Sequence, residues 1–154
     1  MQAIQKYTDG LGLLAITAWA GGLWGVGYLA VPVLFGSLQD RMLAGAVAGK
    51  MFTAVAYVGI VCAVYLLAYR LALYRKAALR QSVFIIVAIM LALTLIGLCG
   101  IQPAIAEIKA QVAPGSVADS PLAGRFGMLH GMASMIYLLQ SLLAAVLVVR
   151  ARNS

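Results

Sequence analysis

Four long apolar segments, separated by short polar connections, constrain the fold of this chain more than any other feature. They cover residues 11–35, 44–69, 83–108 and 126–149. Each contains the run of about 20 mostly apolar residues that an α-helix needs to cross about 30 Å of hydrocarbon. Backbone groups in lipid must pair within helices or a closed barrel, and barrel strands are shorter and alternate in polarity. The sequence therefore predicts an all-α integral membrane protein.

The short connections predict how these segments are arranged. Successive spans joined by short loops form an antiparallel four-helix bundle. We expect one domain over residues 1–154, because the length leaves no room for a second folded unit. The first helix is expected to begin near Thr8 and Asp9. Pro32 is expected to end or kink it, and Pro103 to kink the third helix, because proline lacks the N–H and clashes with the preceding turn.

Basic residues are concentrated on the side of the bundle that carries both termini. Seven of the eleven lysines and arginines belong to this side: Lys6, Arg70, Arg75, Lys76, Arg80, Arg150 and Arg152. The positive-inside rule predicts that both termini and the 70–80 loop are cytoplasmic, as in a multi-pass protein of the bacterial inner membrane. The net charge of +7 does not indicate a nucleic-acid partner, because the chain lacks a basic helix and interleaved aromatic residues.

Small residues recur at the four-residue spacing that allows close approach of membrane helices. The pairs are Ala18-x3-Gly22, Gly21-x3-Gly25 and Gly45-x3-Gly49. We interpret them as contacts within the bundle, with a homo-oligomer or another membrane protein as the alternative partner. The tripeptide Leu-Ala-Gly opens both the second and the fourth segment, at 43–45 and 122–124, which raises the alternative of two duplicated hairpins.

Polar side chains inside the predicted spans are candidate functional residues, because such groups are costly in lipid. Lys50 and His130 lie at similar depth from the outer side in the second and fourth segments. Each begins a polar stripe at helical spacing, and polar residues near the outer end of the third segment could join them. The candidate ligand-binding residues are Lys50, Thr53, Tyr57, Gln102, Glu107, Arg125, His130, Ser134 and Tyr137.

Each of these residues also has a plainer interpretation. Lys50 could extend its ammonium to the interface, and His130 could be a hydrogen-bonded packing residue. Tyr57 and Tyr137 could be ordinary bundle residues. Glu107 and Arg125 could be interfacial charges. The two stripes at similar depth favour a pocket that opens toward the outer side.

The fourth segment also carries a methionine stripe, at 128, 132 and 135. Thioethers and an imidazole suit Cu(I), so His130, Met128 and Met132 are weak metal candidates. His130 is rotated by roughly 165° from this stripe at about 100° per residue, so one helix cannot present all of them to one ion. The alternative is a lipid-facing or packing stripe.

Enzyme chemistry receives little support from the sequence. No carboxylate lies in the central part of any span, and no phosphate-binding glycine loop or zinc-protease motif is present. We therefore name no catalytic residue. One histidine cannot provide bis-histidine haem ligation within a single chain, so no cofactor is predicted, with haem or copper as the alternative.

Three stretches of the chain resemble a known family. They are Pro32-x-x-Phe35, Arg41-x-x-Ala44-Gly45-x3-Gly49-x-x-Phe52 and Phe126-x3-His130-Gly131. They resemble a domain-of-unknown-function family of small four-span bacterial inner-membrane proteins, which looks related to the eukaryotic cisplatin-resistance transmembrane protein. The architecture is more distantly similar to the copper-resistance membrane domain and to bacterial protoporphyrinogen oxidase. Those groups place several histidines within their helices, whereas this chain has one.

Three functions stay open at this point. The first is transport or binding of a small solute, metal or drug in an outward-facing polar pocket, which the resemblance to a resistance protein favours. The second is a non-catalytic assembly or scaffold subunit of a membrane complex. The third is a redox membrane protein that binds haem or copper.

Overall fold

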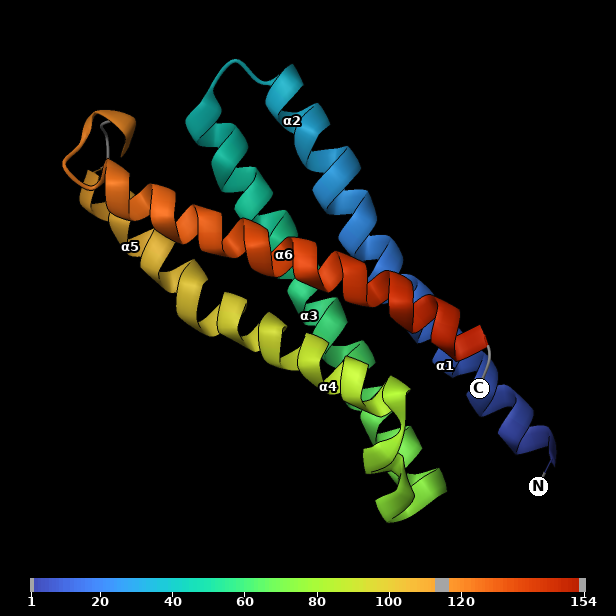
Figure 1. Ribbon diagram of the computed structural model, residues 1–154. Coiled ribbons are helices and arrows are strands. Elements are labelled where there is room, and N and C mark those ends of the chain that lie inside the picture. The colour runs from blue at the N-terminus through green and yellow to red at the C-terminus, as the bar shows by residue number, and fades with distance from the viewer. Residues whose placement is uncertain (1, 113–116, 153–154) are drawn as a thin grey trace.

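Helices make up nearly all of the described structure, a computed structural model that covers residues 2–112 and 117–152 (Figure 1). No strand occurs in these two ranges. Four helical stretches are long and apolar enough to cross a membrane, namely Gly10–Ser37, Arg41–Arg80, Ser82–Val112 and Ala123–Ala151. The prediction of an all-α, multi-pass membrane protein is thereby confirmed.

Each span is longer than its predicted apolar segment. The first consists of α1 (Gln2–Trp24), η1 (Gly25–Ala30) and α2 (Val31–Ser37). The second is α3 (Arg41–Tyr74), followed by the 3₁₀ turn η2 (Arg75–Arg80). The third consists of α4 (Ser82–Leu95), η3 (Ile96–Ile101) and α5 (Gln102–Val112). The fourth is α6 (Ala123–Arg152), preceded by the short turn η4 (Val117–Asp119).

The predicted start of the first helix is wrong. The helix begins at Gln2, so Thr8 and Asp9 lie inside α1 and do not precede it. Both prolines lie within continuing spans, because α2 extends beyond Pro32 to Ser37 and α5 extends beyond Pro103 to Val112. The predicted loop 112–122 is described only in part, since residues 113–116 lie outside the described ranges.

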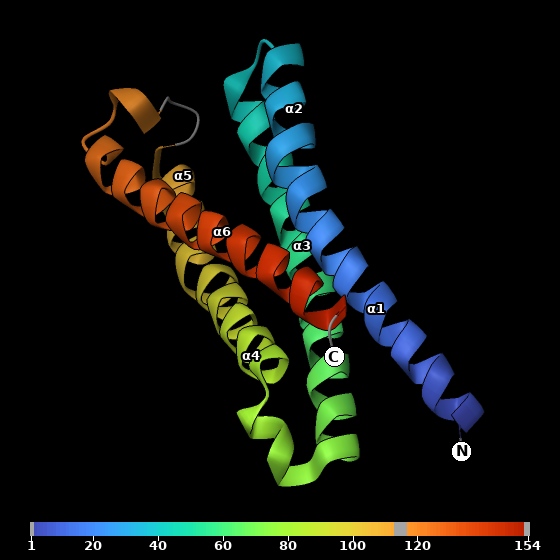
Figure 2. The ribbon, with the colours of Figure 1, turned by 45° about the vertical axis from the view of Figure 1, so that its right-hand side comes forward.

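The four spans run antiparallel and cross one another. Both α1 and α4 pack against α3 and α6, so α1 and α4 occupy opposite corners of the bundle. We call the end that holds Gln2, η2 and Arg152 the termini end, and the end that holds residues 38–40 and η4 the opposite end. Toward the opposite end the α2–α3 pair and the α5–α6 pair separate in both views (Figures 1 and 2).

The core lies where the spans cross. Its largest fully buried side chains are Trp19, Val87, Met90, Ile108 and Leu147. The indole of Trp19 on α1 lies against Gly59 on α3, where a Cβ atom would overlap the indole nitrogen. Large apolar side chains face outward on the spans, including Leu14, Leu29, Val61 and Met135. An apolar outer surface is what a helix bundle surrounded by lipid tails requires.

Two π-helical turns explain how the first and third spans contain proline. At the end of η1 the N–H of Val31 donates to the carbonyl of Val26. At the end of η3 the N–H of Gln102 donates to the carbonyl of Gly97. In both cases the donor lies five residues after the acceptor and directly precedes a proline. The wider turn separates the proline ring from the carbonyl four residues earlier, where an α-helix would clash. The helices therefore continue without breaking.

Polar contacts stabilise the connection before α3 and the connection between α3 and α4. Asp40 caps α3, because its Oδ1 accepts hydrogen bonds from the N–H groups of Met42 at 2.8 Å and Leu43 at 3.1 Å. At the termini end Arg70 Nη1 donates to Gln81 Oε1 at 2.9 Å and ties α3 to the start of α4. Arg75 ends α3 with φ of 51°, in the region of positive φ that is uncommon for residues other than glycine.

Candidate functional site

An open, mostly apolar pocket with a few polar side chains lies between α3 and α5, on the side of the bundle where the two hairpins separate. It has a volume of about 310 Å³. Its lining comes from one face of each helix: Gly45, Ala46, Gly49, Lys50, Thr53, Gln102, Ile105, Ala106 and Lys109. Three of the predicted ligand-binding residues, Lys50, Thr53 and Gln102, are thus brought together in one pocket.

Glycines on α3 provide the room for this pocket. A Cβ atom at Gly45 would lie 3.8 Å from Lys109 Nζ, so the ammonium of Lys109 reaches across from α5 to α3. A Cβ atom at Gly49 would meet nothing within 4 Å. The Gly45-x3-Gly49 pair, which we interpreted as a helix contact, lines the pocket.

The polar groups of the pocket differ in what they can bind. The Thr53 hydroxyl donates to the carbonyl of Gly49 at 2.9 Å, so its oxygen remains as an acceptor. The Lys50 and Lys109 ammonium groups are donors only, and the Gln102 amide can donate or accept. No acidic side chain lines the pocket among the described residues. The arrangement can hold a ligand that accepts hydrogen bonds and carries negative charge.

Six of the nine predicted residues lie outside this lining, and three of them are exposed side chains on three different helices. Tyr57 is on α3 and is exposed on the surface of the bundle. Glu107 on α5 is exposed, and its Oε1 accepts a hydrogen bond from Gln111 Nε2 at 3.3 Å. Arg125 is exposed in the first turn of α6.

His130 and Ser134 lie on α6 and do not line the pocket. The imidazole of His130 is exposed and stacks on Phe126, with ring centroids 5.9 Å apart and planes 7° apart. The Ser134 hydroxyl donates to the backbone carbonyl of His130 at 2.9 Å. Lys50 and His130 therefore do not share the pocket.

Tyr137 connects α6 to the first span. Its hydroxyl donates a hydrogen bond to the backbone carbonyl of Leu23, and its ring lies against Gly27. Phe52 on α3 packs edge-on against the same ring, with centroids 5.1 Å apart. These contacts give Tyr137 a role in joining three spans.

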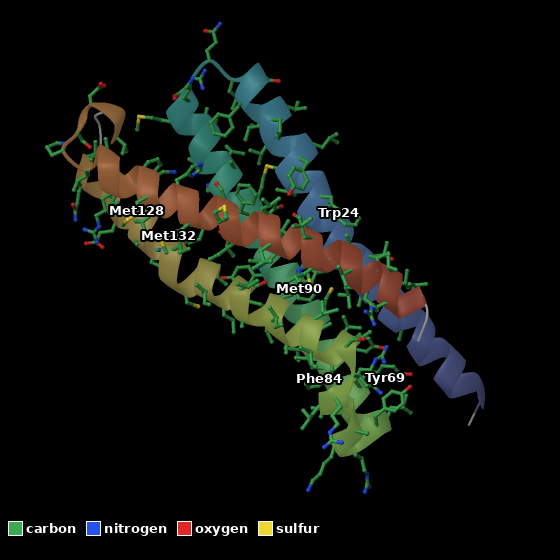
Figure 3. All side chains as sticks on the ribbon, in the orientation of Figure 1. Trp24, Tyr69, Phe84, Met90, Met128 and Met132 are labelled. Atoms are coloured by element: carbon green, nitrogen blue, oxygen red, sulfur yellow. The ribbon has the colours of Figure 1, made fainter. Side chains whose placement is uncertain are left out.

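Sequence reasoning missed two groups of polar residues. Lys109 is absent from the predicted ligand-binding residues, although it follows Gln102 by seven residues and so lies on the same helix face. The other group consists of Thr94, Gln140 and Ser141, which are buried, together with the partly exposed Trp24. Gln140 Nε2 on α6 donates to Thr94 Oγ1 on α4 at 3.2 Å, and Trp24 Nε1 on α1 donates to the Ser141 carbonyl at 3.3 Å (Trp24 is labelled in Figure 3). The sequence signal that could have identified them is the position of polar side chains in the middle of predicted spans.

The three weak metal candidates all lie on α6. Met128 and Met132 are exposed on α6, as is His130, and Figure 3 labels both methionines. Within residues 2–112 and 117–152 there is no group of three or more histidine, cysteine, aspartate or glutamate residues that could hold a metal ion.

A comparison with protein families matches about two thirds of the chain. The model of a family described as a domain of unknown function (DUF4149) matches residues 14–114. This chain belongs to the DUF4149 family. All residues that line the α3–α5 pocket lie inside the matched region, whereas α6 lies beyond it. No curated protein and no solved structure matches the chain.

Proposed function

We propose that this DUF4149 protein binds a small solute in the pocket between α3 and α5 of a bacterial inner-membrane bundle. The observation that supports this most is the convergence of Lys50, Thr53, Gln102 and Lys109 from two helices on one volume of about 310 Å³. This is at the lower end of the range of about 300–1,000 Å³ typical of small-molecule sites. The polar groups are few and the rest of the lining is small and apolar, as in such sites.

The position of the pocket favours access from one side of the membrane. It lies toward the opposite end of the bundle, away from the basic η2 turn and the termini. The charge asymmetry of the sequence predicts that this end faces outward. We propose that the pocket receives its solute from the outer side and that binding serves uptake, export or retention there. We also propose that the DUF4149 family is related to the eukaryotic cisplatin-resistance transmembrane protein, as the sequence resemblance suggests.

Filling the pocket tests the proposal. Gly49→Leu would place a side chain in the pocket, and its Cβ atom would meet nothing within 4 Å. Gly21→Leu is the matched control, since Gly21 on α1 is exposed and equally unobstructed. The purified full-length protein in lipid nanodiscs would be screened against small anionic, neutral and cationic solutes by thermal unfolding.

A solute present at 100 times its Kd should stabilise the wild type and Gly21→Leu by about 2.7 kcal/mol. Gly49→Leu should lose this stabilisation. Equal stabilisation of all three proteins, or none by any solute, would contradict a binding role for the pocket.

A further inference from the structure

We propose that the ligand of the α3–α5 pocket is an anion bearing a phosphate group, a proposal that rests on the solute-binding function above. The first argument is charge. Lys50 and Lys109 are the charged residues of the lining, and they come from different helices. Lys109 Nζ lies 3.8 Å from the Cβ position of Gly45, so its ammonium lies over the α3 side of the pocket.

No acidic side chain lines this pocket among the described residues, and two of the four acidic residues have other hydrogen-bond partners. Asp40 caps the first turn of α3, and Glu107 accepts a hydrogen bond from Gln111. Asp119 is exposed on η4, and Asp9 lies in α1 toward the termini end. The lining thus supplies two ammonium groups and no carboxylate to neutralise them. A bound anion could accept hydrogen bonds from both.

The remaining lining identifies the class of anion further. Gln102 offers an amide donor beside the two lysines, which together can surround several oxygens of one group. Lysine binds phosphate as a compact charge, so no fixed bidentate geometry is needed. Ala46, Ile105 and Ala106 provide apolar surface next to these donors. A phosphate group attached to an apolar or small organic part matches both kinds of lining.

The depth of the site is consistent with this class. Lys50 follows the first residue of α3 by nine positions, which places it about 14 Å along the helix axis from Arg41. A hydrocarbon layer of about 30 Å centred on the 34-residue helix α3 would place Lys50 near its edge. The phosphate could belong to the headgroup of an anionic lipid or to a free phosphorylated solute, and the experiment separates these two sources.

The test uses the full-length protein in nanodiscs. One arm titrates inorganic phosphate into discs of phosphatidylcholine and measures binding by calorimetry. The other arm reconstitutes the protein in phosphatidylglycerol and phosphatidylcholine mixtures and counts retained lipids by native mass spectrometry. The variants are Lys50→Gln, Lys109→Gln and the double variant. Lys76→Gln is the matched control, because Lys76 is exposed in η2 at the termini end.

Loss of each charge-assisted contact should weaken binding by about tenfold in the single variants, and the Lys76 control should match the wild type. Lys50→Arg and Lys109→Arg should retain binding, which separates charge from packing. Phosphate binding in phosphatidylcholine identifies a free solute. Selective phosphatidylglycerol retention without phosphate binding identifies a lipid headgroup.

Anion binding that persists undiminished in the double variant would overturn the proposal. So would a neutral or cationic solute that stabilises the wild type but not Gly49→Leu, in which case the proposed function stands and the phosphate class fails. If no ligand of any charge distinguishes Gly49→Leu from wild type, both the function and the ligand class fail.

Discussion

Single glycines decide how closely the spans approach each other. At Gly59 on α3 a Cβ atom would overlap the indole of Trp19, which is only 1% exposed and cannot move aside easily. At Gly27 in η1 a Cβ atom would overlap the Tyr137 ring on α6. Such close approach is how membrane helices gain packing energy, because lipid tails provide no hydrophobic drive between them.

Gly59→Ala should therefore destabilise the fold by about 1–3 kcal/mol, the usual effect of overpacking a core. Gly49→Ala on the same helix should have a much smaller effect, because its Cβ would meet nothing within 4 Å. Unfolding of the reconstituted protein by detergent titration measures both. Equal stability of the two variants would show that Trp19 can reposition.

The buried pair of Gln140 and Thr94 predicts an asymmetric response to substitution. Thr94 Oγ1 donates to the Met90 carbonyl at 2.8 Å and accepts from Gln140 Nε2 at 3.2 Å. Gln140→Leu leaves the Thr94 hydrogen bond in place and should cost only about 0.6 kcal/mol, the average for such bonds in membrane helices. Thr94→Val removes the acceptor of a buried amide and should cost about 1–3 kcal/mol. The same unfolding assay compares them, and a larger loss for Gln140→Leu would refute this assignment.

At the scale of elements, the N-cap residue Asp40 sets the start of α3 at Arg41. Asp40 accepts two backbone hydrogen bonds from the first turn. Asp40→Ala should cost about 1 kcal/mol, and Asp40→Asn should cost less because asparagine also caps helices well. Hydrogen exchange of the Met42 and Leu43 amides gives a local measurement. Unchanged exchange in Asp40→Ala would show that the cap contributes little.

The π-turns are the elements that sequence patterns described least well. Pro32 and Pro103 predicted an end or a kink, and the structure retains both helices by widening one turn before each proline. Gln102, which lines the pocket, is the residue whose N–H closes the second of these turns. The local geometry of η3 therefore helps to set which face of α5 is directed toward α3.

At the scale of the whole molecule, four spans place both termini at the same end of the bundle (Figure 1). The basic residues there predict a cytoplasmic location for that end. In a background with Cys62 and Cys99 replaced by serine, Gln39→Cys should react with a membrane-impermeant maleimide on intact cells. Ala77→Cys should react only after permeabilisation. The reverse pattern would show the opposite orientation.

Residue patterns along the chain were enough to predict the class of this protein, because four apolar runs of sufficient length can satisfy their backbone in lipid only as helices. They also identified Lys50, Thr53 and Gln102 as polar residues near one end, since charge and amide groups in a span are conspicuous. The partners of these residues depend on how the helices pack. Helical spacing gives the face of each helix but not which helix that face meets, so the expected neighbour His130 lies elsewhere and Lys109 lies beside Lys50. The crossing of the spans and the separation of the two hairpins set that choice, and they depend on contacts such as Trp19 on Gly59 between residues far apart in the chain.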